Sequence, residues 1–329
     1  MVSKIMNRRA FAFALAVGLS AIAAPAHADD YPSRAITIIV PYPAGGPTDQ
    51  TARVVAQSLS KQLKQSVVVE NVSGGGTVIA TNKVTKATPD GYTLLLHNLQ
   101  ISANVTLYKN LPFNTEKDLE PIIFVNRNPL VLVGRASLEA NDWPQLVALM
   151  KKSTMKAAIP GYGATGHLAT SLLAQEAGVK IDMIPYRGAA PAINDVLGGH
   201  VDLFFATPQS IVQQVATGKM KAYGITSKDK VPELPNLKSF VDVLGPKLEI
   251  QFWQALFAPA GTPAAVINKL NAAVQVAVSD PEVVKVWTKE GVSTYPKDQQ
   301  TTAAAKAMLH SEIERWGNVI RTNNIHLDQ

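Results

Sequence analysis

The sequence predicts an α/β protein with two lobes that face a single cleft. Short apolar runs alternate with amphipathic stretches along the chain, a pattern typical of parallel sheets covered by helices. In addition, a strand, a glycine loop and a helix start follow one another twice, at residues 36–49 and 157–168. Ligands of open α/β sheets bind at the carboxyl ends of strands, where both loops fall. The two loops are therefore expected to face the same cleft.

Eight segments are predicted to be strands because they are short and nearly all apolar, as in strands buried on both faces. They are Ile36–Pro41, Val67–Glu70, Tyr92–Leu96, Leu130–Gly134, Lys156–Ile159, Ile181–Tyr186, Val201–Phe205 and Ala222–Thr226. Apolar residues recur at helical spacing from Ala52 to Leu63. Thr262 and Pro263 have the form of a cap and a first helical residue. The segment from Pro263 to Arg321 is expected to be mostly helical.

The amino terminus has the form of an export signal. A basic segment at residues 4–9 precedes the apolar stretch Ala10–Ala24, and Ala26-His27-Ala28 resembles a signal-peptidase site. Residues 1–28 are therefore predicted to be a cleaved signal peptide, with the mature chain starting at about Asp29 in the periplasm. Arg8-Arg9-Ala10-Phe11 weakly resembles a twin-arginine motif, so the choice between the Sec and twin-arginine routes stays open, with Sec favoured.

Composition narrows the function classes. The 329 residues carry a formal net charge of +6, and three basic residues belong to the predicted signal, so the mature chain is only mildly basic. This charge fits a small anionic ligand, whereas nucleic-acid binding would need clustered Lys and Arg. The chain has no cysteine, which excludes disulfides, thiol nucleophiles and thiolate metal sites.

The first glycine loop offers a cup for an anion. Gly45 and Gly46 have no side chains, so a ligand could approach the backbone closely. A helix is expected to begin near Thr48 or Asp49, and its free N–H groups would carry partial positive charge. A carboxylate or phosphate suits such a place. The alternative is a plain strand-to-helix turn with Asp49 as the N-cap, and the two interpretations stay open.

The second loop contains Gly161-x-Gly163-x-x-Gly166, which fits a dinucleotide-binding pattern. That function needs an acidic residue at the end of the next strand, whereas Asp182 stands near the start of its strand. Together with the export signal, this favours a second anion-binding loop. No cofactor is expected.

Polar side chains also follow several predicted strands. His97 and Asn98 end one strand and could donate to a ligand oxygen, or could be neutral surface residues. Arg187 could clamp a carboxylate or pair with a surface acid. Thr207 could orient a ligand or cap a turn. These alternatives stay open.

Catalysis has little support in the sequence. No pair of histidines has metal-ligand spacing, no G-x-S-x-G elbow is present, and no serine has a triad context. Asp49 and Asp202 are the only acids expected near a cleft, and both are better explained as structural. No catalytic residue and no metal site are therefore predicted.

Several motifs resemble one family when taken together. They are Ile39-Val40-Pro41-Tyr42-Pro43-Ala44-Gly45-Gly46-Pro47-Thr48-Asp49, Val68-Val69-Glu70-Asn71 followed by Gly74-Gly75-Gly76, Pro89-Asp90-Gly91-Tyr92-Thr93-Leu94-Leu95, Gly166-His167-Leu168-Ala169, Tyr186-Arg187-Gly188, and Leu256-Phe257-Ala258-Pro259-Ala260-Gly261-Thr262-Pro263. They run in order over nearly all the mature chain. The set resembles the substrate-binding proteins of tripartite tricarboxylate transporters, also called Bug proteins.

The resemblance implies a two-lobed periplasmic-binding-protein, or Venus-flytrap, fold, each lobe a mostly parallel sheet flanked by helices. The expected lobes are residues 30–128 plus 248–329, and residues 129–247. It also implies a monomeric receptor, not an enzyme, that captures a small organic carboxylate and delivers it to the large and small integral membrane subunits of a permease.

The resemblance further implies where the ligand binds. One carboxylate would meet the first loop, and the second loop would close over it, while residues at two strand ends would vary with the ligand. With Arg187, whose role stays open, the candidate ligand-binding residues are Tyr42, Ala44, Gly45, Gly46, Thr48, His97, Asn98, Gly163, Ala164, Thr165, Arg187, Ala206 and Thr207.

The chain departs from the family pattern at Ala164, where a hydroxyl is often found, so a backbone N–H or a water would replace that contact. The identity of the carboxylate stays open among di- and tricarboxylates, amino-acid-like acids and aromatic carboxylates. The rival hypothesis is a secreted non-metallo hydrolase or isomerase of the same fold.

Overall fold

The computed structural model describes residues 31–327 and contains two five-stranded sheets. The predicted signal peptide, 1–28, and its cleavage site lie outside the described residues. The first sheet has the order β2-β1-β3-β10-β4, and the second has the order β7-β6-β8-β5-β9. Their strands are β1 (Ile36–Val40), β2 (Val67–Asn71), β3 (Thr93–Asn98), β4 (Leu119–Pro129), β10 (Gln251–Pro259), β5 (Val131–Arg135), β6 (Met155–Ile159), β7 (Ile181–Pro185), β8 (Leu203–Ala206) and β9 (Met220–Ile225).

The two sheets have the same plan. In the first, β1 pairs in parallel with β2 and β3, and β10 then pairs antiparallel with both β3 and β4. In the second, β6 pairs in parallel with β7 and β8, and β5 pairs antiparallel with both β8 and β9. Each sheet therefore has one reversed strand, and the expected mostly parallel α/β architecture is confirmed.

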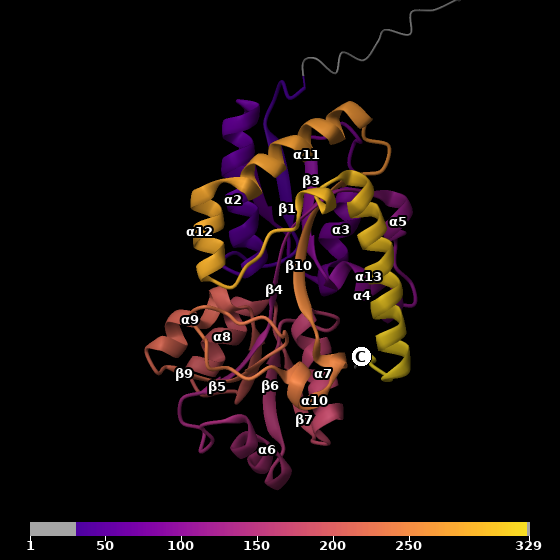
Figure 1. The fold of residues 1–329 in the computed structure, drawn as a ribbon. Coiled ribbons are helices and arrows are strands. Elements are labelled where there is room, and N and C mark those ends of the chain that lie inside the picture. The colour runs from indigo at the N-terminus through magenta and orange to yellow at the C-terminus, as the bar shows by residue number, and fades with distance from the viewer. Residues whose placement is uncertain (1–30, 328–329) are drawn as a thin grey trace, which may run out of the picture. The chain divides into compact units, whose positions relative to one another are not determined.

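Helices flank both sheets (Figure 1). They are α2 (Pro47–Leu63), α3 (Val78–Thr85), α4 (Gln100–Leu107), α5 (Thr115–Asp118), α6 (Trp143–Lys152), α7 (Thr165–Ala177), α8 (Ala189–Leu197), α9 (Pro208–Ala216), α10 (Phe240–Leu244), α11 (Ala264–Ser279), α12 (Pro281–Lys289) and α13 (Thr302–Thr322). At the first sheet α2 packs with α11, and α4 packs with α13. Helices α7 and α8 pack against β6 and β8 of the second sheet. Among the described residues, no helix is both long and apolar enough to span a bilayer.

The chain passes between the sheets through a hydrogen-bonded junction centred on Thr226. The fully buried Thr226 hydroxyl accepts from the Leu130 N–H at 2.8 Å and donates to the Ile250 carbonyl at 2.7 Å. Backbone bonds join the same three residues, from Thr226 N to Leu130 O and from Ile250 N to Thr226 O. The segments that leave β4, leave β9 and enter β10 are therefore tied at one point.

All eight predicted strands are confirmed, with ends shifted by no more than two residues. Strands β4 and β10 were not predicted. Two cap predictions are wrong. The N-cap of α2 is Gly46, not Asp49, and Asp49 lies in the first turn. The N-cap of α11 is Pro263, while the Thr262 hydroxyl donates back to the Pro259 carbonyl at 2.7 Å.

Candidate functional site

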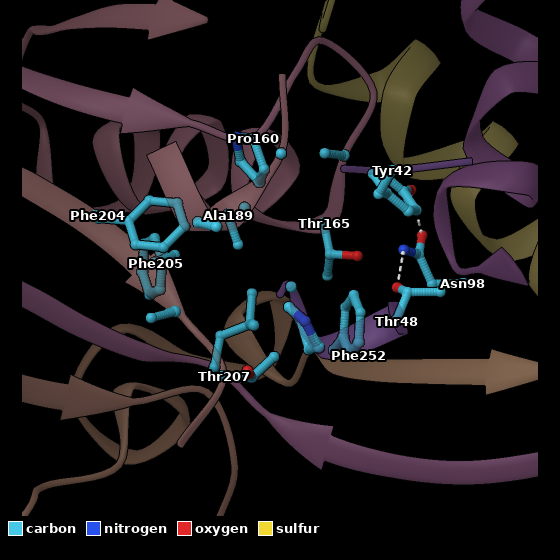
Figure 2. Close-up of a pocket in the computed structure, with 18 of the residues that line it drawn as sticks. Tyr42, Thr48, Asn98, Pro160, Thr165, Ala189, Phe204, Phe205, Thr207 and Phe252 are labelled. Carbon is cyan, nitrogen blue, oxygen red and sulfur yellow. Dashed lines mark hydrogen bonds between the residues drawn. The ribbon is translucent and has the colours of Figure 1, made fainter. Parts of the chain in front are cut away.

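A cavity of about 50 Å³ lies between the two sheets, at the carboxyl ends of strands from both (Figure 2). Residues of the first sheet and its helices line one side, and residues of the second line the other. None of the lining residues has a charged side chain. They are Tyr42, Pro43, Gly46, Pro47, Thr48, Asn98, Leu130, Pro160, Ala164, Thr165, Gly166, Gly188, Ala189, Ala190, Pro191, Phe204, Phe205, Ala206, Thr207 and Phe252.

Four helices begin at the cavity wall, and none of them is capped by a side chain. The N-caps of α2, α7, α8 and α9 are Gly46, Ala164, Gly188 and Thr207, and all four line the cavity. The first N–H groups of a helix have no partner inside the helix and carry partial positive charge. The uncapped helix starts therefore give the cavity a positive potential without a cationic side chain.

Among the other described α-helices, five are capped by a side chain, whereas α3, α4 and α11 are not. Side chains accept first-turn N–H groups at the starts of α5, α6, α10, α12 and α13. The capping residues are Asn114, Asp142, Ser239, Asp280 and Thr301. The uncapped starts of the cavity helices leave donors that a ligand could use.

Asp49 braces the first glycine loop from behind. Its carboxylate accepts from the Gly45 N–H, from the Arg53 guanidinium and from Asn71, all at 3.0 Å. Asn71 also donates to the Tyr42 carbonyl at 3.0 Å. Burial alone would raise the pKa of Asp49, but these hydrogen bonds outweigh it and lower the pKa. The carboxylate thus stays ionised and fixes the loop, and it does not line the cavity.

Gly45 is the residue of this loop whose backbone conformation requires a glycine. Gly45 has φ +86°, which disfavours any side chain, whereas Gly46 has φ −81° in extended backbone. A Cβ at Gly46 would have one neighbour within 4 Å, the Pro43 carbonyl at 3.9 Å. Gly46 is therefore needed for space at the cavity, not for the turn.

Two threonine hydroxyls supply further donors. Thr48 accepts from the Asn98 amide at 3.2 Å, which leaves its own proton free to donate. Thr165 is 3% exposed, and its hydroxyl has no hydrogen-bond partner among the described residues. In Figure 2 the Thr165 hydroxyl points toward Tyr42 and Asn98. An unpaired buried hydroxyl is costly, so Thr165 indicates a place for a ligand acceptor.

A buried network holds Asn98 in place. The Tyr42 hydroxyl lies 2.9 Å from the Asn98 side-chain oxygen and 2.7 Å from that of Gln100. The Gln100 N–H also donates to the Asn98 side-chain oxygen at 3.0 Å. Burial raises the pKa of Tyr42 far above its usual range, so its hydroxyl stays neutral. With its oxygen held this way, Asn98 directs its amide toward Thr48.

His97 lies behind this network and does not line the cavity. It is fully buried, and its Nδ1 accepts the Asn98 N–H at 2.7 Å. Burial lowers the pKa of His97 to about 3, against a smaller opposing effect of the backbone hydrogen bond. The ring is therefore neutral with its proton on Nε2, which has no partner among the described residues. His97 meets the Tyr42 ring edge to face at 6.0 Å.

The second glycine loop touches the first half of the chain beside the cavity, where Gln100 and Tyr162 line the neighbouring groove. The Gln100 side chain donates to the Tyr162 carbonyl at 2.9 Å. Gly163 has φ +78°, and a Cβ there would lie 2.9 Å from atoms of Asn104 and Leu107 on α4. The Gly163 N–H donates to Nδ1 of His167, in the first turn of α7, at 3.1 Å, and this hydrogen bond holds the loop against the helix. Only a glycine allows this approach.

The structure gathers eight of the thirteen predicted site residues at the cavity. They are Tyr42, Gly46, Thr48, Asn98, Ala164, Thr165, Ala206 and Thr207. The other five are Ala44, Gly45, His97, Gly163 and Arg187. Arg187 lines a neighbouring groove of about 460 Å³ that shares Tyr42 and Gly188 with the cavity. Ligand contact by any of the thirteen stays a prediction.

Sequence reasoning missed much of the apolar lining. Leu130, Phe252 and Ala189 line the cavity, and none of them is among the predicted site residues. A signal for Ala189 was present, since the Gly188-Ala189-Ala190-Pro191 run after a strand repeats the glycine-then-helix pattern. Leu130 and Phe252 belong to the segments that cross between the sheets, and no local pattern marks such a crossing.

Comparisons with known proteins agree with one another. BugT of Bordetella pertussis is 33% identical over 326 residues, covering 98% of this chain and 99% of BugT. The structure of the periplasmic binding protein BugD matches with a TM-score of 0.86 and 34% identity, covering 90% of this chain and 99% of BugD. MatC from Rhodopseudomonas palustris, solved with bound malate, matches with a TM-score of 0.84 and 30% identity, covering 88% of this chain and 100% of MatC.

The sequence model of the tripartite tricarboxylate transporter family receptor matches residues 51–325. The expected two-lobed binding-protein fold is confirmed by these matches, and the enzyme alternative is set aside because the family is one of solute receptors. The chain belongs to the tripartite tricarboxylate transporter receptor family, whose members include the Bug proteins.

Proposed function

We propose that this protein captures a small organic carboxylate in the cavity between its lobes. The observation that carries the proposal is the convergence of four uncapped helix starts and the unpaired Thr165 hydroxyl on one cavity. An anion is the partner that such N–H groups favour. The malate in MatC supports a carboxylate as the anion.

The receptor would work in the periplasm and pass its ligand to the two membrane subunits of a permease. Family membership supports this partner. The lobes would comprise residues 30–128 plus 248–329, and residues 129–247, and would close about the Thr226 junction.

A thermal-shift screen of the mature protein against mono-, di- and tricarboxylates tests the function. A carboxylate at 100 times its Kd should stabilise the fold by about 2.7 kcal/mol, and a matched amide or alcohol should not. If no carboxylate in the panel raises Tm, the proposed function is wrong.

The variant Gly46→Val tests the site. A valine at Gly46 meets little in the protein but projects at the cavity, so binding should be lost while Tm without ligand changes little. Gly218→Ala, at a loop glycine with φ +70° and no neighbour within 4 Å, is the control away from the cavity: backbone strain should lower its Tm, and binding should be unchanged. Undiminished binding by Gly46→Val would place the site elsewhere.

A further inference from the structure

We infer that the ligand is a short aliphatic monocarboxylate, with its carboxylate at one end of the cavity and a small apolar body at the other. This inference rests on the proposed function and narrows its substrate class. It comes from the uneven distribution of polar groups around the cavity.

The polar end lies at the starts of α2 and α7. Thr48, Asn98 and Thr165 gather there, and Figure 2 shows them on one side of the cavity with Tyr42. The Thr165 hydroxyl is buried and unpaired among the described residues. The Thr48 hydroxyl is the acceptor in its bond with Asn98, so its own proton can be donated to a ligand. All of these groups can donate, and one carboxylate accepts several such hydrogen bonds.

The opposite end is apolar. Phe204, Phe205, Pro160 and Ala189 lie together on the other side of the cavity in Figure 2. The helices that begin on this side are α8 and α9.

The first turn of α8 contains Pro191, which has no N–H, and α9 begins with Pro208, as α2 begins with Pro47 at the polar end. The Thr207 hydroxyl already pairs with Ser210 at 2.9 Å. No lining side chain at this end is both polar and unpaired among the described residues. A second carboxylate would find helix N–H groups there but no unpaired side-chain donor, and would regain less of its lost hydration than the first.

The volume limits the size of the apolar body. The cavity measures about 50 Å³, whereas an engineered apolar cavity that binds benzene measures about 150 Å³. A body of a few carbon atoms, such as that of propionate or isobutyrate, is closer to this space than an aromatic ring.

Calorimetry with the mature protein tests the inference directly. Propionate and isobutyrate should bind at least about tenfold more tightly than succinate, malate or benzoate, because a buried unpaired carboxylate or an oversized ring is penalised. Succinate, malate or benzoate binding as tightly as isobutyrate would overturn the inference and leave the proposed function intact. If none of these acids binds, the inference is overturned, and the wider thermal-shift panel decides the proposed function.

A variant that fills the apolar end provides a second test. Ala189→Leu should weaken isobutyrate by at least about tenfold and leave acetate, which needs only the polar end, within about twofold. Ala303→Leu, at an exposed position in the first turn of α13, is the matched control and should change neither affinity. Equal losses of acetate and isobutyrate in Ala189→Leu would contradict an apolar end at this helix.

Discussion

The variant Gly163→Ala isolates a contact between the two lobes beside the cavity. A Cβ at Gly163 would lie 2.9 Å from Asn104 Oδ1 and 2.9 Å from Leu107 Cδ1, so α4 and the second loop would have to separate. Overpacking of this kind costs about 1–3 kcal/mol. If the ligand-bound form is the one with this contact, the cost falls on that form and Kd should rise about 5- to 150-fold.

The matched control is Gly178→Ala. Gly178 also has positive φ, at +63°, but nothing lies within 4 Å of its Cβ position. Both variants carry a backbone strain of about 1–2 kcal/mol, which is present with and without ligand and so cancels in Kd. Gly178→Ala should therefore lower Tm and leave Kd unchanged.

Titration calorimetry with the acid that gives the largest thermal shift measures both values of Kd. Adding Leu107→Ala to Gly163→Ala should restore part of the lost affinity, because it removes one of the two crowded atoms. If Gly163→Ala binds with the same Kd as Gly178→Ala, closure of the second loop onto α4 is not part of binding.

Three further variants test the supports of the site. His97→Gln should flatten the pH dependence of stability, because the folded pKa of about 3 lies below the unfolded value of about 6.5. The wild type should therefore lose up to about 1.4 kcal/mol of unfolding free energy per pH unit as pH falls from about 6.5 toward 3. Urea titrations at several pH values that give the same change of unfolding free energy with pH for both proteins would contradict this. Asp49→Asn should weaken carboxylate binding by loosening the first loop, whereas Arg53→Ala, which removes only the exposed partner, should have a smaller effect; calorimetry giving equal losses would show that loop bracing is unimportant. Thr226→Val should lower the unfolding free energy by about 2–4 kcal/mol, since two buried backbone groups lose their partner, and thermal melts should show almost no change for the surface control Thr322→Val.

The sequence was sufficient for the strands that are buried on both faces and for the two glycine loops. It was not sufficient for β4 and β10, and the reason is physical. These strands carry buried amides. Gln254 donates to Asn126 across the strand pair, both donate to Thr51 of α2, and Asn128 donates to Gln209. Such residues interrupt an apolar run, and their pairing partners are more than a hundred positions apart in sequence.

The same limit applies to the site. Thr48 and Thr165 could be predicted because each stands at a helix start after a glycine loop. The placement of His97 could not, because an identical strand end could direct the ring into the cavity or behind it. Here the ring lies behind Asn98 and holds its N–H, while Gln100, which no motif singles out, joins Asn98 to the opposite lobe.

A site without a cationic side chain has a consequence for release as well as for capture. A bidentate arginine would attract a carboxylate strongly in both open and closed forms. Helix N–H groups and hydroxyls act only within hydrogen-bond distance, and the donors of α2 and those of α7 belong to different lobes. Both sets can reach one carboxylate when the lobes approach, and separating the lobes by a few ångströms removes one set entirely. Affinity for the proposed carboxylate would therefore be controlled by closure. A partner that pulls the lobes apart, through the Gly163 and Gln100 contacts, would release the anion without having to neutralise a charge.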